Sequence, residues 1–184
     1  MEFELKKETL RFYEFSTVSS AGHEESTETI VPDYCPDIAR IIDASGKVFL
    51  RSKDIQGDKA IVTGSVKVTV LFTPEGENGI RNLEFALPFN TSVVNQEFDR
   101  CQCLFAKVCV QSIETRSMNP RKIFTRVLLT VQLRGLRHAE AAFCSHIAAD
   151  TALGIAQMEQ EAELNLNTAY SEKDFTFTDE VAVP

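Results

Sequence analysis

The sequence predicts a mainly β protein, an antiparallel β-sandwich, with closure into a barrel as the alternative. Two observations lead to this fold class. Apolar and polar residues alternate with period two through several stretches in the middle of the chain, and turn-forming residues separate these stretches at hairpin spacing. One-sided alternation in consecutive strands is typical of antiparallel sheets, which keep one face on a core and the other in water.

The first predicted hairpin joins residues 66–72 to residues 83–89. Every second residue in these ranges is Val, Leu or Phe, and the connection at 74–79 reads Pro-Glu-Gly-Glu-Asn-Gly. Proline, glycine and asparagine are the residues that tight turns require, so the two strands are expected to be neighbours. Pro88 has no backbone N–H to donate, which predicts that the second strand lies at a sheet edge or carries a bulge.

A second hairpin is predicted between residues 106–110 and residues 123–133. The intervening Asn119-Pro120 pair favours a turn, because the residue before proline is pushed away from helical backbone angles. The apolar face of such a sheet needs a second layer. Strand-like segments at 9–15, 26–31, 47–51 and 174–183, or a helix, could supply it.

Two segments are expected to be helical. Residues 36–43 begin with Pro36 and Asp37, carry isoleucines at helical spacing, and are followed by Gly46, which predicts a short helix. Residues 139–166 are rich in Ala, Glu and Gln and repeat apolar residues at helical spacing, although Gly154 interrupts them. A helix is therefore predicted within this range.

Composition limits the classes of function. The chain of 184 residues is 43% apolar, enough for a core, and its formal charge is −8 from 19 basic and 27 acidic residues. An acidic chain is a poor match for nucleic acid or anionic lipid, so neither is expected as a partner. No secretory signal and no stretch long enough to cross a membrane is recognised, and a cytosolic origin without membrane insertion is expected.

The cysteines allow two interpretations, since an odd number in a cytosolic chain is poor evidence for a disulfide framework. They act either as small buried apolar residues or as sites of later cross-linking in a layer that becomes oxidised. A zinc site would need four converging ligands, and the cysteine spacings do not match those of zinc knuckles, so no metal is expected. The five are Cys35, Cys101, Cys103, Cys109 and Cys144.

No catalytic motif is recognised. The histidines His23, His138 and His146 do not lie in a nucleophile motif, and the eight glycines are scattered rather than gathered in a phosphate-binding loop. A hydrolase would need His138 or His146 beside a cysteine or carboxylate in a cleft. We therefore expect a protein that is not an enzyme and that takes no cofactor and no small-molecule ligand.

A short internal repeat links the two ends of the chain. Residues 180–184, Glu-Val-Ala-Val-Pro, are similar to residues 28–32, Glu-Thr-Ile-Val-Pro. Both follow a polar, threonine-bearing run. This similarity predicts that the chain stops where a second copy of the unit would begin.

Several segments together resemble a known domain family. The longest, at 28–43, reads Glu-Thr-Ile-Val-Pro-Asp-Tyr-Cys-Pro-Asp-Ile-Ala-Arg-Ile-Ile-Asp. Others lie at 64–72, 87–89 (Leu-Pro-Phe), 119–122 (Asn-Pro-Arg-Lys) and 173–178. They are similar to the SPOCS domain, the repeated β-rich module of clostridial spore-coat proteins. One such protein is the morphogenetic partner of the stage IV sporulation protein A ATPase.

The resemblance implies that residues 1–184 form one SPOCS-like domain, the first of several repeats in a longer parent chain. It also implies that this domain is a structural module of the bacterial spore coat. Such a module would act without catalysis, through self-association or through recruitment of other spore-coat proteins. Its expected location is the mother-cell cytoplasm and then the coat or outer spore layers. The alternative is a glycan-binding β module at the spore envelope, although the chain lacks tryptophan and has three tyrosines.

Candidate interaction residues come from two segments. In the run 31–43, Tyr34, Asp37 and Arg40 could form a docking surface, because tyrosine and arginine are enriched in interface hot spots; a purely structural capped turn is the alternative. Around the second hairpin, basic residues could contact an acidic patch such as Glu159, Glu161 and Glu163 on another subunit, or simply face solvent. The basic candidates are Arg116, Arg121 and Lys122.

Overall fold

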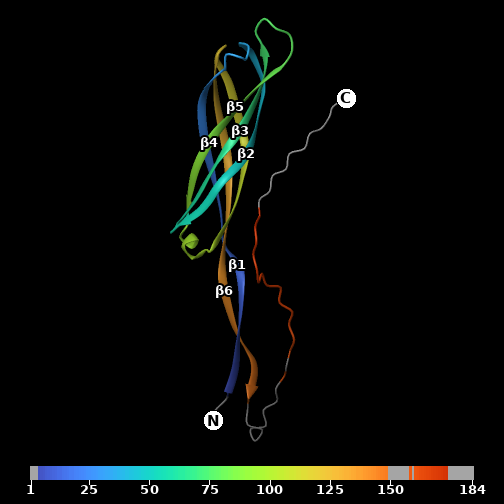
Figure 1. The fold of residues 1–184 in the computed structure, drawn as a ribbon. Helices are drawn as coiled ribbons and strands as arrows, with labels where there is room; N and C mark the ends of the chain where they lie inside the picture. The colour runs from blue at the N-terminus through green and yellow to red at the C-terminus, as the bar shows by residue number, and fades with distance from the viewer. Residues whose placement is uncertain (1–3, 149–157, 159, 174–184) are drawn as a thin grey trace, which may run out of the picture. The chain divides into compact units, whose positions relative to one another are not determined.

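The structure is a computed structural model that describes residues 4–148, 158 and 160–173. Its strands are β1 (Glu4–Ile30), β2 (Ile38–Gln56), β3 (Lys59–Pro74), β4 (Arg81–Val94), β5 (Cys103–Asn119) and β6 (Lys122–Ala148). A short 3₁₀ helix, η1 (Gln96–Arg100), lies between β4 and β5 (Figure 1). The mainly β fold that the sequence predicts is therefore confirmed.

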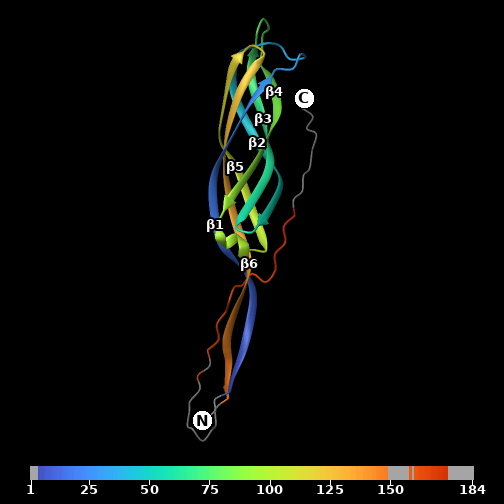
Figure 2. The same cartoon turned by 90° about the vertical axis from the view of Figure 1, so that its left-hand side faces the viewer.

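The strands form two antiparallel three-stranded sheets, with the orders β1-β6-β5 and β2-β3-β4 (Figure 2). Neither sheet closes into a barrel, so the predicted sandwich is confirmed and its barrel alternative is wrong. The chain divides into two compact units. Residues Phe15–Arg137 make up one, and the chain up to Glu14 together with the chain from His138 onward makes up the other.

The core of the unit Phe15–Arg137 comes from alternate residues of its central strands. On β3 the inward side chains are mostly valines, and on β6 they are branched aliphatic residues, as period-two alternation predicts. These side chains are almost completely buried. Their removal from water is the main contribution to the stability of the fold. The fully buried set includes Val62, Val66, Val68, Val70, Phe72, Ile123, Val127, Leu129, Val131 and Leu133.

Gly46 on β2 allows close packing between the two sheets. A Cβ atom at this position would lie 2.5 Å from Cδ1 of Ile113 on β5 and 2.9 Å from Cγ1 of Val66 on β3. Real Cβ atoms do not approach other carbons so closely, so a side chain at Gly46 would force β2 away from β5.

Both predicted hairpins are present. β3 pairs with β4 in an unbroken register, and Pro88 lies opposite Ser65. Because β4 is the last strand of its sheet, the expectation of an edge position for Pro88 is confirmed, and no bulge is needed. β5 pairs with β6 around the turn at Asn119 and Lys122.

The helix expected at 36–43 is wrong, because this segment is the start of β2. Register shifts occur between Ile38 and Arg40 and between Ile41 and Asp43. Each shift inserts an extra residue and resets the alternation of side chains. As a result Ile38, Ile41 and Ala44 all pack against the core at a spacing of three, which imitates one face of a helix.

The helix expected within 139–166 is also wrong over the residues that the structure describes. Residues 139–148 continue β6, residues 160–166 have no regular structure, and residues 149–157 and 159 lie outside the described part. Cross-strand contacts with β1 favour the extended form: Arg11 pairs with Glu140 at 2.8 Å, and the rings of Tyr13 and His138 lie 4.1 Å apart. Such tertiary contacts override the helix propensity of an Ala- and Glu-rich sequence.

The strand expected at 174–183 also lies outside the described residues. Over the described residues, the structure contains no helix with the length and apolar character needed to cross a membrane.

Candidate protein-interaction surface

Two connections meet at one end of the unit Phe15–Arg137. The β1–β2 connection, residues 31–37, lies against the β5–β6 turn, residues 119–122. Two backbone hydrogen bonds join them: Val31 N–H donates to the carbonyl of Arg121, and Ile38 N–H donates to the carbonyl of Pro120, both at 2.9 Å. The connection therefore begins and ends on the same turn. We name residues 31–37 with residues 119–122 the clamped loop.

The side chain of Arg121 reaches into the clamped loop. Nη1 of Arg121 donates to the carbonyl of Cys35 at 2.7 Å and to Oδ1 of Asp37 at 3.0 Å, and Nη2 donates to Oδ1 of Asp33 at 3.0 Å. Its side chain is 34% exposed, so the bonds to Cys35 and Asp37 are partly shielded from water, whereas Asp33 is fully exposed. The planar guanidinium contacts three points of the loop at once.

Further bonds support the turn that carries Arg121. Oδ1 of Asn119 accepts from the backbone N–H of Arg121 at 2.9 Å, as an asparagine at the start of a turn commonly does. Lys122 forms an ion pair with Glu28 on β1. Cys35 N–H donates to the carbonyl of Pro32 at 2.9 Å, which closes a turn inside the loop itself.

Tyr34 lies at the tip of this clamped loop and is 87% exposed. Ile30, the last residue of β1, is 72% exposed. The backbone on either side of Tyr34 is held by the bonds described above, so an exposed aromatic side chain stands on a loop whose conformation is fixed. This arrangement suits a contact residue, since little backbone order has to be gained on binding.

The other predicted interaction residues lie outside the clamped loop. Arg40 is an exposed residue of β2, and its carbonyl accepts from the hydroxyl of Thr73. Arg116 is an exposed residue of β5 whose guanidinium lies 4.9 Å from the ring centre of Phe124 on β6. Of the six candidates, the structure thus brings together four, namely Tyr34, Asp37, Arg121 and Lys122.

Arg116 lines a surface cavity of about 380 Å³ on the β5–β6 hairpin. Arg126 faces the same cavity and forms ion pairs with Glu114 and Glu24. The hydrogen bond to Glu114, and then the charges of Glu114 and Glu24, raise the pKa of Arg126 above its ordinary value. The remaining lining residues are Thr115 and Phe124.

The acidic patch expected as a counterpart of the basic hairpin is described only in part. Glu161 and Glu163 are exposed, and Glu159 lies outside the described residues.

All five cysteines are free thiols. Cys35, Cys101 and Cys103 are partly buried, which is the environment expected of small apolar residues, whereas Cys109 and Cys144 are exposed. Cross-linking by these thiols stays a prediction. Among the described residues, no three His, Cys, Asp or Glu side chains come close enough together to hold a metal ion.

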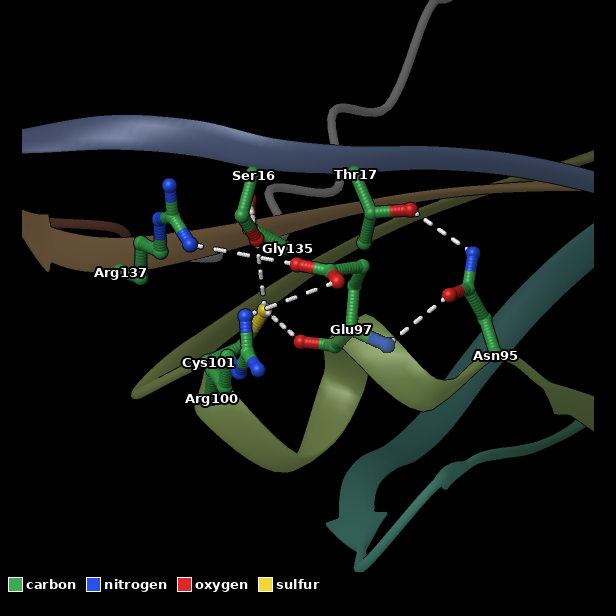
Figure 3. Close-up of polar contacts among 8 residues, drawn as sticks. All are labelled: Ser16, Thr17, Asn95, Glu97, Arg100, Cys101, Gly135 and Arg137. Atoms are coloured by element: carbon green, nitrogen blue, oxygen red, sulfur yellow. Dashed lines mark hydrogen bonds and ion pairs between the residues drawn. The ribbon is translucent and has the colours of Figure 1, made fainter.

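Cys101 belongs to a polar network around η1, which Figure 3 shows. Its Sγ lies 3.0 Å from Oγ of Ser16 and donates to the carbonyl of Glu97 at 3.2 Å. A Cβ atom added at Gly135 would lie 2.3 Å from this sulfur, so the thiol occupies the space that the glycine leaves. Glu97 also pairs with Arg100 and Arg137 at 3.8 and 3.9 Å.

Asn95 caps η1 and ties it to β1. Its Oδ1 accepts from the backbone N–H of Glu97 at 3.0 Å, and its Nδ2 donates to the hydroxyl of Thr17 at 2.8 Å (Figure 3). The same Nδ2 also donates to the hydroxyl of Ser19 at 2.9 Å. Sequence reasoning missed this cap, although an asparagine followed by Glu97 and Asp99 is a recognisable helix start.

Sequence reasoning also missed the role of Arg121. The residue was expected either to face solvent or to contact an acidic patch on another subunit, but its guanidinium binds groups of its own chain. The sequence feature that could have predicted this role is the pair of acids on either side of Tyr34, Asp33 and Asp37. Two carboxylates in one short loop are stabilised by a nearby cation.

Comparison with known proteins gives one family match. Residues 37–116 match the family model described as "SipL, SPOCS domain". The matched range covers β2, β3, β4 and η1 and most of β5, apart from its last residues. No curated protein and no solved structure matches the chain significantly. The resemblance read from the sequence is therefore confirmed at the level of the domain, and residues 37–116 of this chain match a SPOCS domain.

Proposed function

We propose that this chain is a non-catalytic assembly module of the bacterial spore coat. It would act in the mother-cell cytoplasm and then in the coat, by recruiting other coat proteins and by associating with itself. The SPOCS match supports a role related to sporulation. The finer statement rests on the clamped loop.

The observation that carries the proposal is the exposure of Tyr34 on a loop that is fixed from both sides. Tyrosine is among the residue types that dominate binding energy at protein interfaces. Its ring offers apolar area, and its hydroxyl offers a hydrogen bond. An isolated tyrosine that is 87% exposed would contribute little to folding, so its position is better explained by contact with another protein.

The fixed backbone around Tyr34 adds to this argument. A flexible loop loses conformational entropy when it binds, and each residue that must be ordered weakens the complex. Here Arg121 already holds the carbonyl of Cys35 and the carboxylates of Asp33 and Asp37. The clamped loop therefore needs little further ordering when it binds a partner.

The partner that the family resemblance suggests is the stage IV sporulation protein A ATPase. The test measures binding of the intact chain to this purified ATPase by calorimetry or surface plasmon resonance. The wild-type chain is compared with Tyr34→Ala and with Phe49→Ala, a control that removes a half-exposed aromatic residue from β2.

If Tyr34 is a hot spot, its truncation should weaken binding about 30-fold or more, which corresponds to roughly 2 kcal/mol. Phe49→Ala should leave the affinity within about threefold. Equal effects of the two substitutions would show that the clamped loop is not the contact surface. Absence of binding by the wild-type chain would reject this ATPase as the partner.

The glycan-binding alternative receives no support from the aromatic residues. A sugar platform needs several exposed rings around one concave surface. The exposed aromatic residues among those described are Phe15, Tyr34, Phe49 and Phe143, and none of them lines the surface cavity on the β5–β6 hairpin.

A further inference from the structure

An isolated antiparallel bridge joins β1 to the segment 160–173. The N–H of Tyr13 donates to the carbonyl of Asn167 at 2.7 Å. Within the described part of the chain, this is the one β-bridge that residues 160–173 make. Both residues belong to the same compact unit.

β1 is the outer strand of its sheet, which has the order β1-β6-β5. In an edge strand, the N–H and C=O groups of every second residue point away from the sheet. Since the backbone N–H of Tyr13 points away from the sheet, the backbone groups of Arg11 and Thr9 are expected to point away from the sheet as well. The edge of β1 thus offers a row of backbone groups that another strand can pair with, and the bridge occupies one position in that row.

The segment that forms the bridge has the sequence pattern of a strand. From residue 162 to residue 170, Ala, Leu, Leu, Thr and Tyr alternate with Glu, Asn, Asn and Ala. This is a clean period-two pattern with one apolar face. Nevertheless, Leu164 is 65% exposed, and among the described residues this strand-like segment forms one bridge and no ladder.

If the register of the bridge is extended along β1, the apolar face of the segment lies opposite apolar side chains of β1. In an antiparallel pair anchored at Tyr13 and Asn167, Thr168 lies opposite Phe12 and Tyr170 lies opposite Leu10. Directly opposite apolar and aromatic side chains stabilise a sheet. The apolar face of the segment would thus cover the partly buried face of β1 that carries Leu10 and Phe12.

We propose that the edge of β1 in one chain takes the segment 160–173 of a second copy as an added antiparallel strand. This inference rests on the proposed assembly function and names a surface for self-association. In the single chain, pairing stops after one bridge. A segment that comes from another molecule is not tethered to the β6 strand beside its target, and it can extend the pairing from Tyr13 toward Thr9.

The exchange keeps the Tyr13–Asn167 contact, now between two chains, and adds the pairing toward Thr9. Domain swapping of this kind is a low-cost route to oligomers, because it starts from a contact that the single chain already makes. If each copy gives its segment to one neighbour and accepts the segment of another, the contact is head-to-tail. Such contacts form rings when they close and filaments when they do not.

A disulfide trap tests whether pairing occurs between copies. One population carries Tyr13→Cys and a second population, with a mass tag, carries Asn167→Cys. Both carry Cys109→Ser and Cys144→Ser to remove the exposed thiols. Residues paired directly across two antiparallel strands have Cβ atoms about 4.5–5.5 Å apart, so a small adjustment of the backbone brings two cysteines within disulfide range. Met158→Cys, at a site that is 95% exposed and outside the register, replaces Asn167→Cys in the control.

Mixing the two populations under mild oxidation should give a covalent heterodimer at least about tenfold faster with Asn167→Cys than with Met158→Cys. Equal rates would overturn the proposal. So would exclusively intramolecular cross-linking in a chain that carries both Tyr13→Cys and Asn167→Cys.

A second measurement follows the mass of the chain by light scattering over a concentration series with reductant. Ala169→Pro removes an N–H that the extended ladder needs, whereas Thr168→Pro removes one that points away from β1. Association of the wild-type chain should weaken about tenfold with Ala169→Pro, the effect of one lost hydrogen bond, and less with Thr168→Pro. A strictly monomeric wild-type chain would overturn the proposal, while Tyr34-dependent binding to the ATPase would remain open to its own test.

Discussion

Replacing Arg121 by methionine should loosen the clamped loop. Methionine keeps much of the aliphatic stem but removes the three donated bonds. The bond to the Cys35 carbonyl and the bond to Asp37 are partly shielded, and each is expected to contribute about 1 kcal/mol. Asp33 is fully exposed, so its bond should contribute almost nothing. The free energy of unfolding should therefore fall by about 2 kcal/mol.

For a chain of this length, that loss corresponds to a fall in Tm of about 4–8 °C. Urea unfolding gives the free energy, and hydrogen exchange at the amides of Val31 and Ile38 reports on the loop itself. These two amides donate to the turn that carries Arg121 and should exchange faster in the variant.

Arg126→Met is the matched control, because it also removes an arginine with two carboxylate partners. Its partners, Glu114 and Glu24, are exposed, and the pair contributes no shielded bond to a backbone carbonyl. No measurable shift in Tm is expected. Equal shifts for the two variants would show that shielding of the Arg121 contacts is not what fixes the loop, and the reasoning would be refuted.

Three further predictions concern the fold. Gly46→Ala should destabilise the protein by about 1–3 kcal/mol in urea unfolding, because its Cβ would overlap Cδ1 of Ile113; an unchanged midpoint would mean that the sheets separate freely. Asn95→Ala removes a helix cap and two bonds to β1, and should lower the unfolding free energy by about 2 kcal/mol in the same assay. The pKa of Glu84 lies below its ordinary value, chiefly because of the hydrogen bond from Lys67, so its contribution to stability is present at neutral pH and is lost as the pH falls through the lowered pKa. Lys67→Met should raise this pKa in an NMR titration, and an unchanged value would contradict the assignment.

The fold class could be predicted because the central strands obey a simple rule. Residues such as Val66 and Val68 on β3 alternate without interruption, and the register of β3 with β4 is unbroken. The error at 36–43 arose where the rule fails locally. Two register shifts bring Ile38, Ile41 and Ala44 to one face at a spacing of three, and no single-segment pattern distinguishes that from a helix.

The error at 139–148 has a different cause. This segment of β6 has good helix formers, and only the pairing of Glu140 with Arg11 and of His138 with Tyr13 shows why it is extended. The contacting residues are more than a hundred positions apart, so a window of sequence does not contain the information.

The candidate surface was partly predictable. Tyr34, Asp37, Arg121 and Lys122 were identified from two separate segments, but their meeting depends on backbone bonds that only the sheet topology creates. The sequence also did not show which charges would be used internally. Arg121 forms ion pairs with Asp33 and Asp37 of its own chain.

This internal pairing changes what kind of contact the clamped loop can make. Lys122 is paired with Glu28, as Arg121 is with Asp33 and Asp37, so the basic charges of the turn are already compensated. A surface that is compensated in this way attracts an acidic partner only weakly at long range. Binding should then come from the apolar ring of Tyr34, whose contribution does not depend on ionic strength. The affinity of the chain for its partner should therefore change less than about threefold between low and physiological salt. A steep loss of affinity with salt would assign the contact to the basic residues instead, and Arg116, which lies over an aromatic ring on the same hairpin, would be the first to test.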